Sequence, residues 1–150
     1  MKLAEALIMR ADLQTRLEQL RQRLAANARV QEGETPAEDP MELLKEMEDA
    51  GDRLETLIGR INLTNAHVTV EGKTLTELLA RREVLGQKVS ILNTLLENAS
   101  STVMRGSRSE VKVLSTVDVR ALRKQADELS KALRTLDTQI QSRNWLEELQ

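Results

Sequence analysis

Apolar residues recur in steps of three and four along most of this 150-residue chain, which is the spacing of one face of an α-helix. In the longest such stretch the positions are Leu78, Leu85, Val89, Leu92, Leu96, Ala99 and Val103, interrupted only by Arg82. The stretch opens with Thr74-Leu75-Thr76-Glu77, a capping box in which the Thr hydroxyl and the Glu carboxylate each satisfy a backbone N–H. We therefore predict a helix over residues 74–104, roughly 45 Å long.

Three more stretches repeat this pattern. We predict helices over residues 2–27, 40–65 and 116–143, followed by an apolar tail at 144–150. Their apolar series are Leu13, Leu17, Leu20 and Leu24; Leu43, Met47, Ala50, Leu54, Leu57, Ile61 and Thr64; and Val119, Leu122, Ala126, Leu129, Leu133, Leu136 and Ile140. Narrow heptad-like series are typical of helices packed in the manner of coiled coils. The sequence predicts a single all-α domain, residues 1–150, of four long antiparallel helices, arranged as a bundle or as paired helical hairpins.

The connections contain turn formers and short extended segments. Residues 28–40 hold Gly33, Pro36 and Pro40, which predicts a loop. Residues 67–70 alternate like a short strand and precede a turn at Gly72, and residues 110–114 are also predicted to be extended. Ser115 or Thr116 is the expected cap of the last helix.

Gly51 and Gly59 lie inside a helix, where each costs about 1 kcal/mol relative to Ala, so we expect a neighbouring backbone to approach there; a flexible hinge is the alternative.

Composition excludes several kinds of chemistry. The chain has no Cys, one His, no Phe and no Tyr, so neither a disulfide nor a Cys/His metal site is available. We expect no catalytic residues, no metal, no cofactor and no enzyme activity. A net charge of −2 gives no reason to expect nucleic-acid binding. The N-terminal residues lack the apolar run of a signal peptide, and no window has about 18 apolar residues. We therefore expect a cytoplasmic protein without a transmembrane segment.

One connection gathers basic residues. Arg105, Arg108 and Lys112 are candidates for binding an anion, a phosphorylated ligand or an acidic partner; a solvated loop is the alternative. Gly72-Lys73-Thr74 resembles the end of a phosphate-binding loop, but the motif requires a glycine where the chain has His67. We therefore interpret Gly72 as a turn residue and His67 as a surface residue.

The predicted tail holds the only aromatic residue. Trp145, Leu146 and Leu149 form an apolar cluster that is a candidate contact with a neighbouring subunit; docking onto the same chain is the alternative. Narrow apolar series over four long helices also favour a homo-oligomer. Arg10 and Arg82 occupy positions within apolar series, where each either pairs with a carboxylate or extends to solvent.

Several segments resemble a family of small bacterial proteins of uncharacterised function whose members have been labelled septicolysin-like. The resemblance rests on residues 1–8, 10–14, 30–34, 60–65, 72–76, 107–112 and 115–119. It implies an all-helical protein, and its label implies pore formation. From the residues we expect a non-enzymatic, self-associating helical scaffold or partner-binding protein. Membrane activity and anion binding at residues 105–112 are the alternatives.

Overall fold

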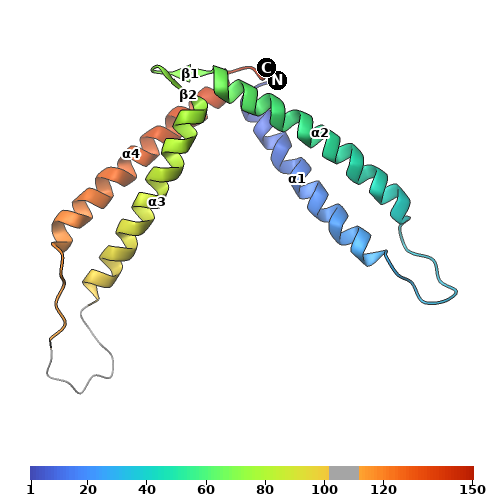
Figure 1. Cartoon of the computed structure of the whole chain (residues 1–150), viewed down its shortest axis with the longest axis horizontal. Helices are drawn as coiled ribbons and strands as arrows, with labels where there is room; N and C mark the ends of the chain where they lie inside the picture. The colour runs from blue at the N-terminus through green and yellow to red at the C-terminus, as the bar shows by residue number, and fades with distance from the viewer. Residues whose placement is uncertain (102–111) are drawn as a thin grey trace. The chain divides into compact units, whose positions relative to one another are not determined.

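The computed structural model describes residues 1–101 and 112–150, and it is dominated by helices (Figure 1). The elements in chain order are α1 (Leu3–Ala26), α2 (Pro40–His67), β1 (Thr69–Val70), β2 (Lys73–Thr74), α3 (Leu75–Ser100) and α4 (Val119–Leu146). The chain divides into two compact units. The first comprises Met1–Thr74 and Ser142–Gln150, and the second comprises Leu75–Gln141. The prediction of an all-α fold with four long helices is confirmed.

In the first unit, α1 packs against α2 through the apolar series seen in the sequence. Every predicted position in both series is buried or half-buried. Leu20 and Ile61 are almost completely inaccessible, with exposed fractions of 0% and 1%. Asp39 caps α2 by accepting a hydrogen bond from the Met41 N–H at 2.9 Å, and Pro40 takes the first helical position.

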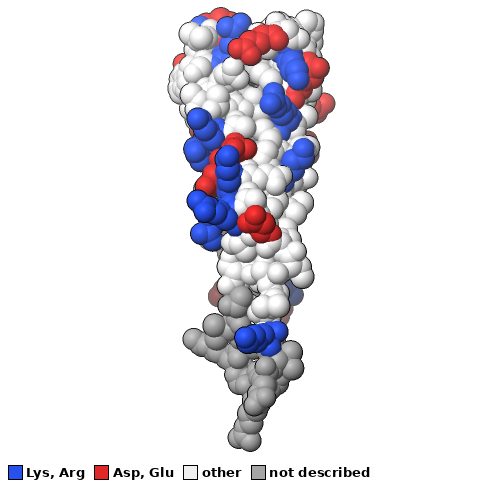
Figure 2. All heavy atoms as spheres, turned by 90° about the vertical axis from the view of Figure 1, so that its left-hand side faces the viewer, with Lys and Arg blue, Asp and Glu red and all other residues white. Residues whose placement is uncertain are grey.

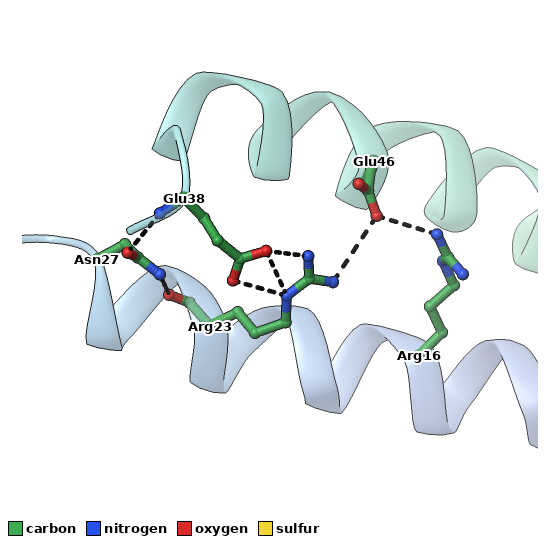
Figure 3. A network of polar contacts seen from close by, with 5 residues as sticks. All are labelled: Arg16, Arg23, Asn27, Glu38 and Glu46. Carbon is green, nitrogen blue, oxygen red and sulfur yellow. Dashed lines mark hydrogen bonds and ion pairs between the residues drawn. The ribbon is translucent and has the colours of Figure 1, made fainter. Parts of the chain in front are cut away.

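A polar network joins the ends of α1 and α2 that flank the 27–39 loop (Figure 3). The Arg23 guanidinium donates to both carboxylate oxygens of Glu38, and Arg16 binds Glu46 at 2.9 Å. The Asn27 amide donates to the Arg23 carbonyl and accepts from the Glu38 N–H. Hydrogen bonding from Arg23 lowers the pKa of Glu38 below its ordinary value. The loop is therefore anchored to both helices.

Strands β1 and β2 form an antiparallel hairpin in which Thr69 pairs with Thr74 and Val70 with Lys73. The two turn residues, Glu71 and Gly72, both have positive φ, at 51° and 80°. This combination defines a type I′ turn, whose twist matches that of the flanking strands. The predicted turn at Gly72 is confirmed. Thr74 lies in β2, so α3 begins one residue later than predicted.

In the second unit, α3 and α4 face each other through their own apolar series. All described members of the two series are buried or half-buried, with Leu78, Leu85 and Leu96 of α3 and Ala126, Leu136 and Ile140 of α4 the most buried. Arg82, which interrupts the α3 series, donates to Asp137 Oδ1 at 3.0 Å. Its side chain remains 36% exposed, so it both pairs with a carboxylate and reaches solvent.

Some predicted boundaries were wrong. Helix α3 ends at Ser100 rather than 104. Helix α4 begins at Val119, not 116, because Asp118 provides the cap: its Oδ1 accepts from the Ala121 N–H at 3.1 Å. It also continues to Leu146 instead of ending at 143. Helix α2 extends to His67 rather than ending at 65.

The expected close approach of a backbone to Gly51 and Gly59 is absent from the described part of the chain. A Cβ added at either glycine would meet nothing within 4 Å. Packing inside this chain therefore does not account for these two helical glycines.

Candidate interaction surface

The C-terminal segment is fixed onto the first unit by backbone hydrogen bonds. The Leu3 N–H donates to the Glu147 carbonyl and the Leu149 N–H donates to the Met1 carbonyl, both at 2.9 Å. The Gln150 N–H donates to Thr64 Oγ1 at 3.0 Å, and Thr64 itself is fully buried. These bonds hold the segment as a short strand-like addition beside the start of α1.

Ionic contacts reinforce this attachment. Lys2 Nζ lies 2.7 Å from the Glu148 carboxylate, and the Met1 amino group lies 2.9 Å from it. Hydrogen bonding from Lys2 is the largest cause that lowers the pKa of Glu148 below its ordinary value. Lys2 Nζ also donates to the Leu146 carbonyl. The C-terminal segment that includes the last turn of α4 is consequently held in place by the first three residues of the chain and by α2.

The three predicted contact residues at this end differ in exposure. Leu149 is 8% exposed, whereas Trp145 and Leu146 are 55% and 65% exposed. Leu149 therefore packs within its own chain. Trp145 and Leu146 lie in the last turn of α4 rather than in a separate tail. They are two large apolar side chains displayed on a fixed helix end.

A second apolar series runs along α3. Val84, Ile91 and Leu95 are 48%, 67% and 40% exposed, and Ala80 is also exposed. The steps of four, seven and four place these residues in one row, about a third of a turn away from the buried series. We call this row the α3 stripe. Our sequence analysis missed it because the buried series accounted for one helix face, although the heptad spacing was readable.

A groove of about 820 Å³ lies between α3 and α4 in the second unit. Its lining includes Leu79, Gly86 and Leu133 together with the Arg82–Asp137 ion pair. An added Cβ at Gly86 would meet nothing within 4 Å, so the glycine leaves this groove wide. The groove is open and holds a charged pair whose two members already satisfy each other.

Charged side chains are unevenly distributed over the surface of the second unit. Figure 2 shows Lys and Arg, with Asp and Glu among them, on both sides of a surface without charges. Five basic residues of α4 are exposed, namely Arg120, Arg123, Lys124, Lys131 and Arg134, and the sixth, Arg143, is half-buried. None of the five forms an ion pair within residues 1–101 and 112–150. The basic surface is therefore available to an external carboxylate or other anion.

The remaining sequence candidates gain no supporting geometry. Arg105 and Arg108 lie outside the described residues, and Lys112 is exposed. His67 is the exposed last residue of α2, with Nδ1 2.8 Å from the Leu63 carbonyl oxygen, as expected of a surface residue. In the described ranges no three His, Cys, Asp or Glu side chains are grouped to hold a metal ion. Arg10 has no ion-pair partner there either.

Among the helices of the described residues, none combines the length and apolar character needed to cross a bilayer.

Comparison with known proteins places the chain in a family. The model of a family of unknown function, DUF6847, matches residues 10–149. A crystal structure of a functionally unknown conserved protein from Corynebacterium diphtheriae is 44% identical in sequence. It superposes with a TM-score of 0.96, over 100% of this chain and 99% of that one. No curated protein matches. Neither match carries a septicolysin label, so that part of the resemblance stays a prediction. The chain belongs to the DUF6847 family of unknown function.

Proposed function

We propose that this protein is a non-enzymatic helical scaffold that works by self-association. The observation that carries the proposal is the α3 stripe, with Val84, Ile91 and Leu95 between 40% and 67% exposed. A two-helix hairpin buries one face of each helix, so a second apolar row at heptad spacing needs a further helix to cover it. Fully burying one such side chain contributes about 1.5–3 kcal/mol.

The charged residues of this unit support assembly rather than catalysis. In the groove between α3 and α4, the one ion pair joins Arg82 and Asp137, which are 36% and 50% exposed. Such a pair suits the positioning of two helices, and we therefore assign the groove a structural role.

The mass of the protein in solution tests the proposal. Light scattering after size exclusion is expected to give a multiple of the chain mass. Ile91→Lys places a charge in the α3 stripe and is expected to reduce that mass. Ser90→Lys adds the same charge at an exposed position off the stripe and is expected to leave the mass unchanged. A wild-type protein with the mass of one chain at all concentrations would overturn the proposal.

Membrane activity is the second candidate, and the same stripe favours it. Exposed Arg81 and Lys88 flank the apolar row of α3, and amphipathic helices that bind anionic lipids combine such features. The septicolysin-like resemblance points the same way. Dye release from anionic liposomes tests this function. Release by wild type that Ile91→Lys abolishes would favour it over scaffolding, whereas intact liposomes at micromolar protein would reject it.

A further inference from the structure

Helices α2 and α4 each carry a row of exposed residues on the side away from their buried series. On α2 the outer row is Glu42, Lys45, Asp49, Asp52, Thr56, Gly59 and Leu63. On α4 the outer row is Lys124, Asp127, Lys131, Arg134, Thr138, Gln141 and Trp145. All fourteen residues are exposed. Both rows advance in alternating steps of three and four, the spacing of a helix surface that meets another helix.

The charges of the two rows have opposite signs at matching positions. When the helices are aligned in the same direction with Glu42 opposite Lys124, Lys45 falls opposite Asp127. In the same alignment, Asp49 falls opposite Lys131 and Asp52 opposite Arg134. At Lys45 and Asp127 the signs are reversed, with the basic residue on α2 and the acidic residue on α4. This reversal is informative, because a generally acidic helix beside a generally basic helix would not require it.

The uncharged ends of the rows also match. Leu63 falls opposite Trp145, and these two side chains are 49% and 55% exposed. One helical turn earlier, Gly59 falls opposite Gln141. Gly59 has open space around it in its own chain, and its missing side chain leaves room for a large neighbour such as an indole ring. A contact at this position accounts for a helical glycine that otherwise costs about 1 kcal/mol.

Within the described residues, these eight charged side chains have no ion-pair partner that would compete with a contact to another copy. None of the eight forms an ion pair elsewhere in the described residues, although other exposed groups do, such as Arg16 with Glu46 and Arg21 with Glu18. Exposed ion pairs contribute only about 0–1 kcal/mol each, so four of them do not hold two chains together unaided. The ion pairs determine the relative direction and register of the two helices, while Leu63 and Trp145 at the uncharged ends of the rows contribute affinity.

We propose that α2 of one copy packs parallel to α4 of a second copy, with Glu42 opposite Lys124 and Leu63 opposite Trp145. This inference rests on the proposed self-association and adds a contact that does not include the α3 stripe. A shift of one heptad places Asp52 opposite Asp127, or Lys45 opposite Arg134, and separates Leu63 from Trp145. Like charges in contact oppose both shifts, so the pattern selects a single register.

Disulfide trapping tests this contact directly, because the chain contains no native cysteine. One preparation carries Asp49→Cys and the other carries Lys131→Cys; the two are mixed and oxidised. We expect a product with the mass of two chains on a non-reducing gel. Asp49→Cys mixed with Thr138→Cys is the control, because Thr138 lies one heptad, about 10 Å, further along α4. The control is expected to cross-link at least tenfold more slowly.

The possible outcomes separate this inference from the proposed function. An oligomeric wild type whose 49–131 pair cross-links no faster than the 49–138 pair would overturn the α2–α4 contact and leave self-association standing. A monomeric wild type would overturn both. A chain carrying both Asp49→Cys and Lys131→Cys that closes on itself at the mass of one chain would show that the contact forms within a chain. That result would also overturn the proposed contact between copies.

Discussion

The α1–α2 and α3–α4 hairpins both bury an apolar series, but α1 and α2 lie much closer together than α3 and α4 do. Besides their buried series, α1 and α2 are joined by the network of Arg16, Arg23, Glu38 and Glu46. In the described part of the α3–α4 hairpin, one ion pair, Arg82–Asp137, joins the two helices. The second hairpin also displays the α3 stripe. A buried apolar series is therefore sufficient to form a hairpin, while the residues outside that series determine which surface the hairpin exposes to a partner.

The largest expected effect is on the buried series of the first hairpin. Leu20 is fully buried, and Leu20→Ala is expected to lower the free energy of unfolding by about 2–5 kcal/mol. Chemical denaturation measures this change. Gln19→Ala, at an exposed neighbouring position, is the control and is expected to change little. A loss below about 1 kcal/mol for Leu20→Ala would contradict the packing described for α1 and α2.

The next effect concerns the α3 stripe and depends on protein concentration. Because an oligomer is stabilised by mass action, the Tm of the wild type is expected to rise as its concentration increases. For Ile91→Lys we expect a Tm that depends less on concentration, because one of the two contacts is lost, whereas Ser90→Lys should behave like the wild type. Differential scanning calorimetry over a hundredfold concentration range measures the difference. Equal concentration dependence in Ile91→Lys and wild type would remove the stripe from assembly.

Charge reversal sharpens the comparison between α2 and α4. Asp49→Lys with Asp52→Lys is expected to weaken association by about tenfold, equivalent to about 1.4 kcal/mol. Lys131→Glu with Arg134→Glu is expected to do the same. Combining all four substitutions restores opposite signs and should recover most of the loss. Sedimentation equilibrium measures the three affinities, and a four-fold variant weaker than either parent would contradict the pairing.

A smaller effect is expected at the ion pair of the second hairpin. Arg82 and Asp137 are 36% and 50% exposed, so the pair is expected to contribute at most about 1 kcal/mol. A double-mutant cycle with Arg82→Gln and Asp137→Asn isolates that interaction from the other effects of each substitution. A coupling of several kcal/mol would mean that the pair is far less accessible to solvent than described.

The smallest effect is a pH dependence at the network of the first hairpin. Arg23 lowers the pKa of Glu38 in the folded state, so the carboxylate stabilises the fold above its ordinary pKa of 4.5. This contribution is lost as the pH falls below 4.5 through the lowered pKa. Glu38→Gln should therefore flatten the decrease of Tm between neutral and acidic pH, measured by circular dichroism. An unchanged pH profile would exclude Glu38 as a contributor.

The apolar spacing was sufficient to predict the helices and their buried faces. Positions such as Leu57 and Leu136 could be assigned because α2 and α4 each have one unbroken series. Boundaries were harder, since Ser115, Thr116 and Asp118 are all residue types that cap helices, and the sequence does not distinguish among them. The hydrogen bond between Leu3 and Glu147 was also beyond sequence reasoning, because no local pattern links residues so far apart.

The candidate surface was only partly readable from the sequence. The exposure of Trp145 and the burial of Leu149 could not be separated, because both depend on where the last segment attaches. The α3 stripe and the paired outer rows of α2 and α4 are heptad patterns, and they were accessible in principle. They become meaningful only when the buried faces are known, since the remaining rows are then the ones left for partners.

The absolute mass in solution tests the central claim most directly. Light scattering after size exclusion at physiological salt is expected to give a defined multiple of the chain mass, reduced by Ile91→Lys and retained by Ser90→Lys. A protein with the mass of one chain at every accessible concentration would contradict the account, because the α3 stripe and the outer rows would then be exposed without a second copy to cover them.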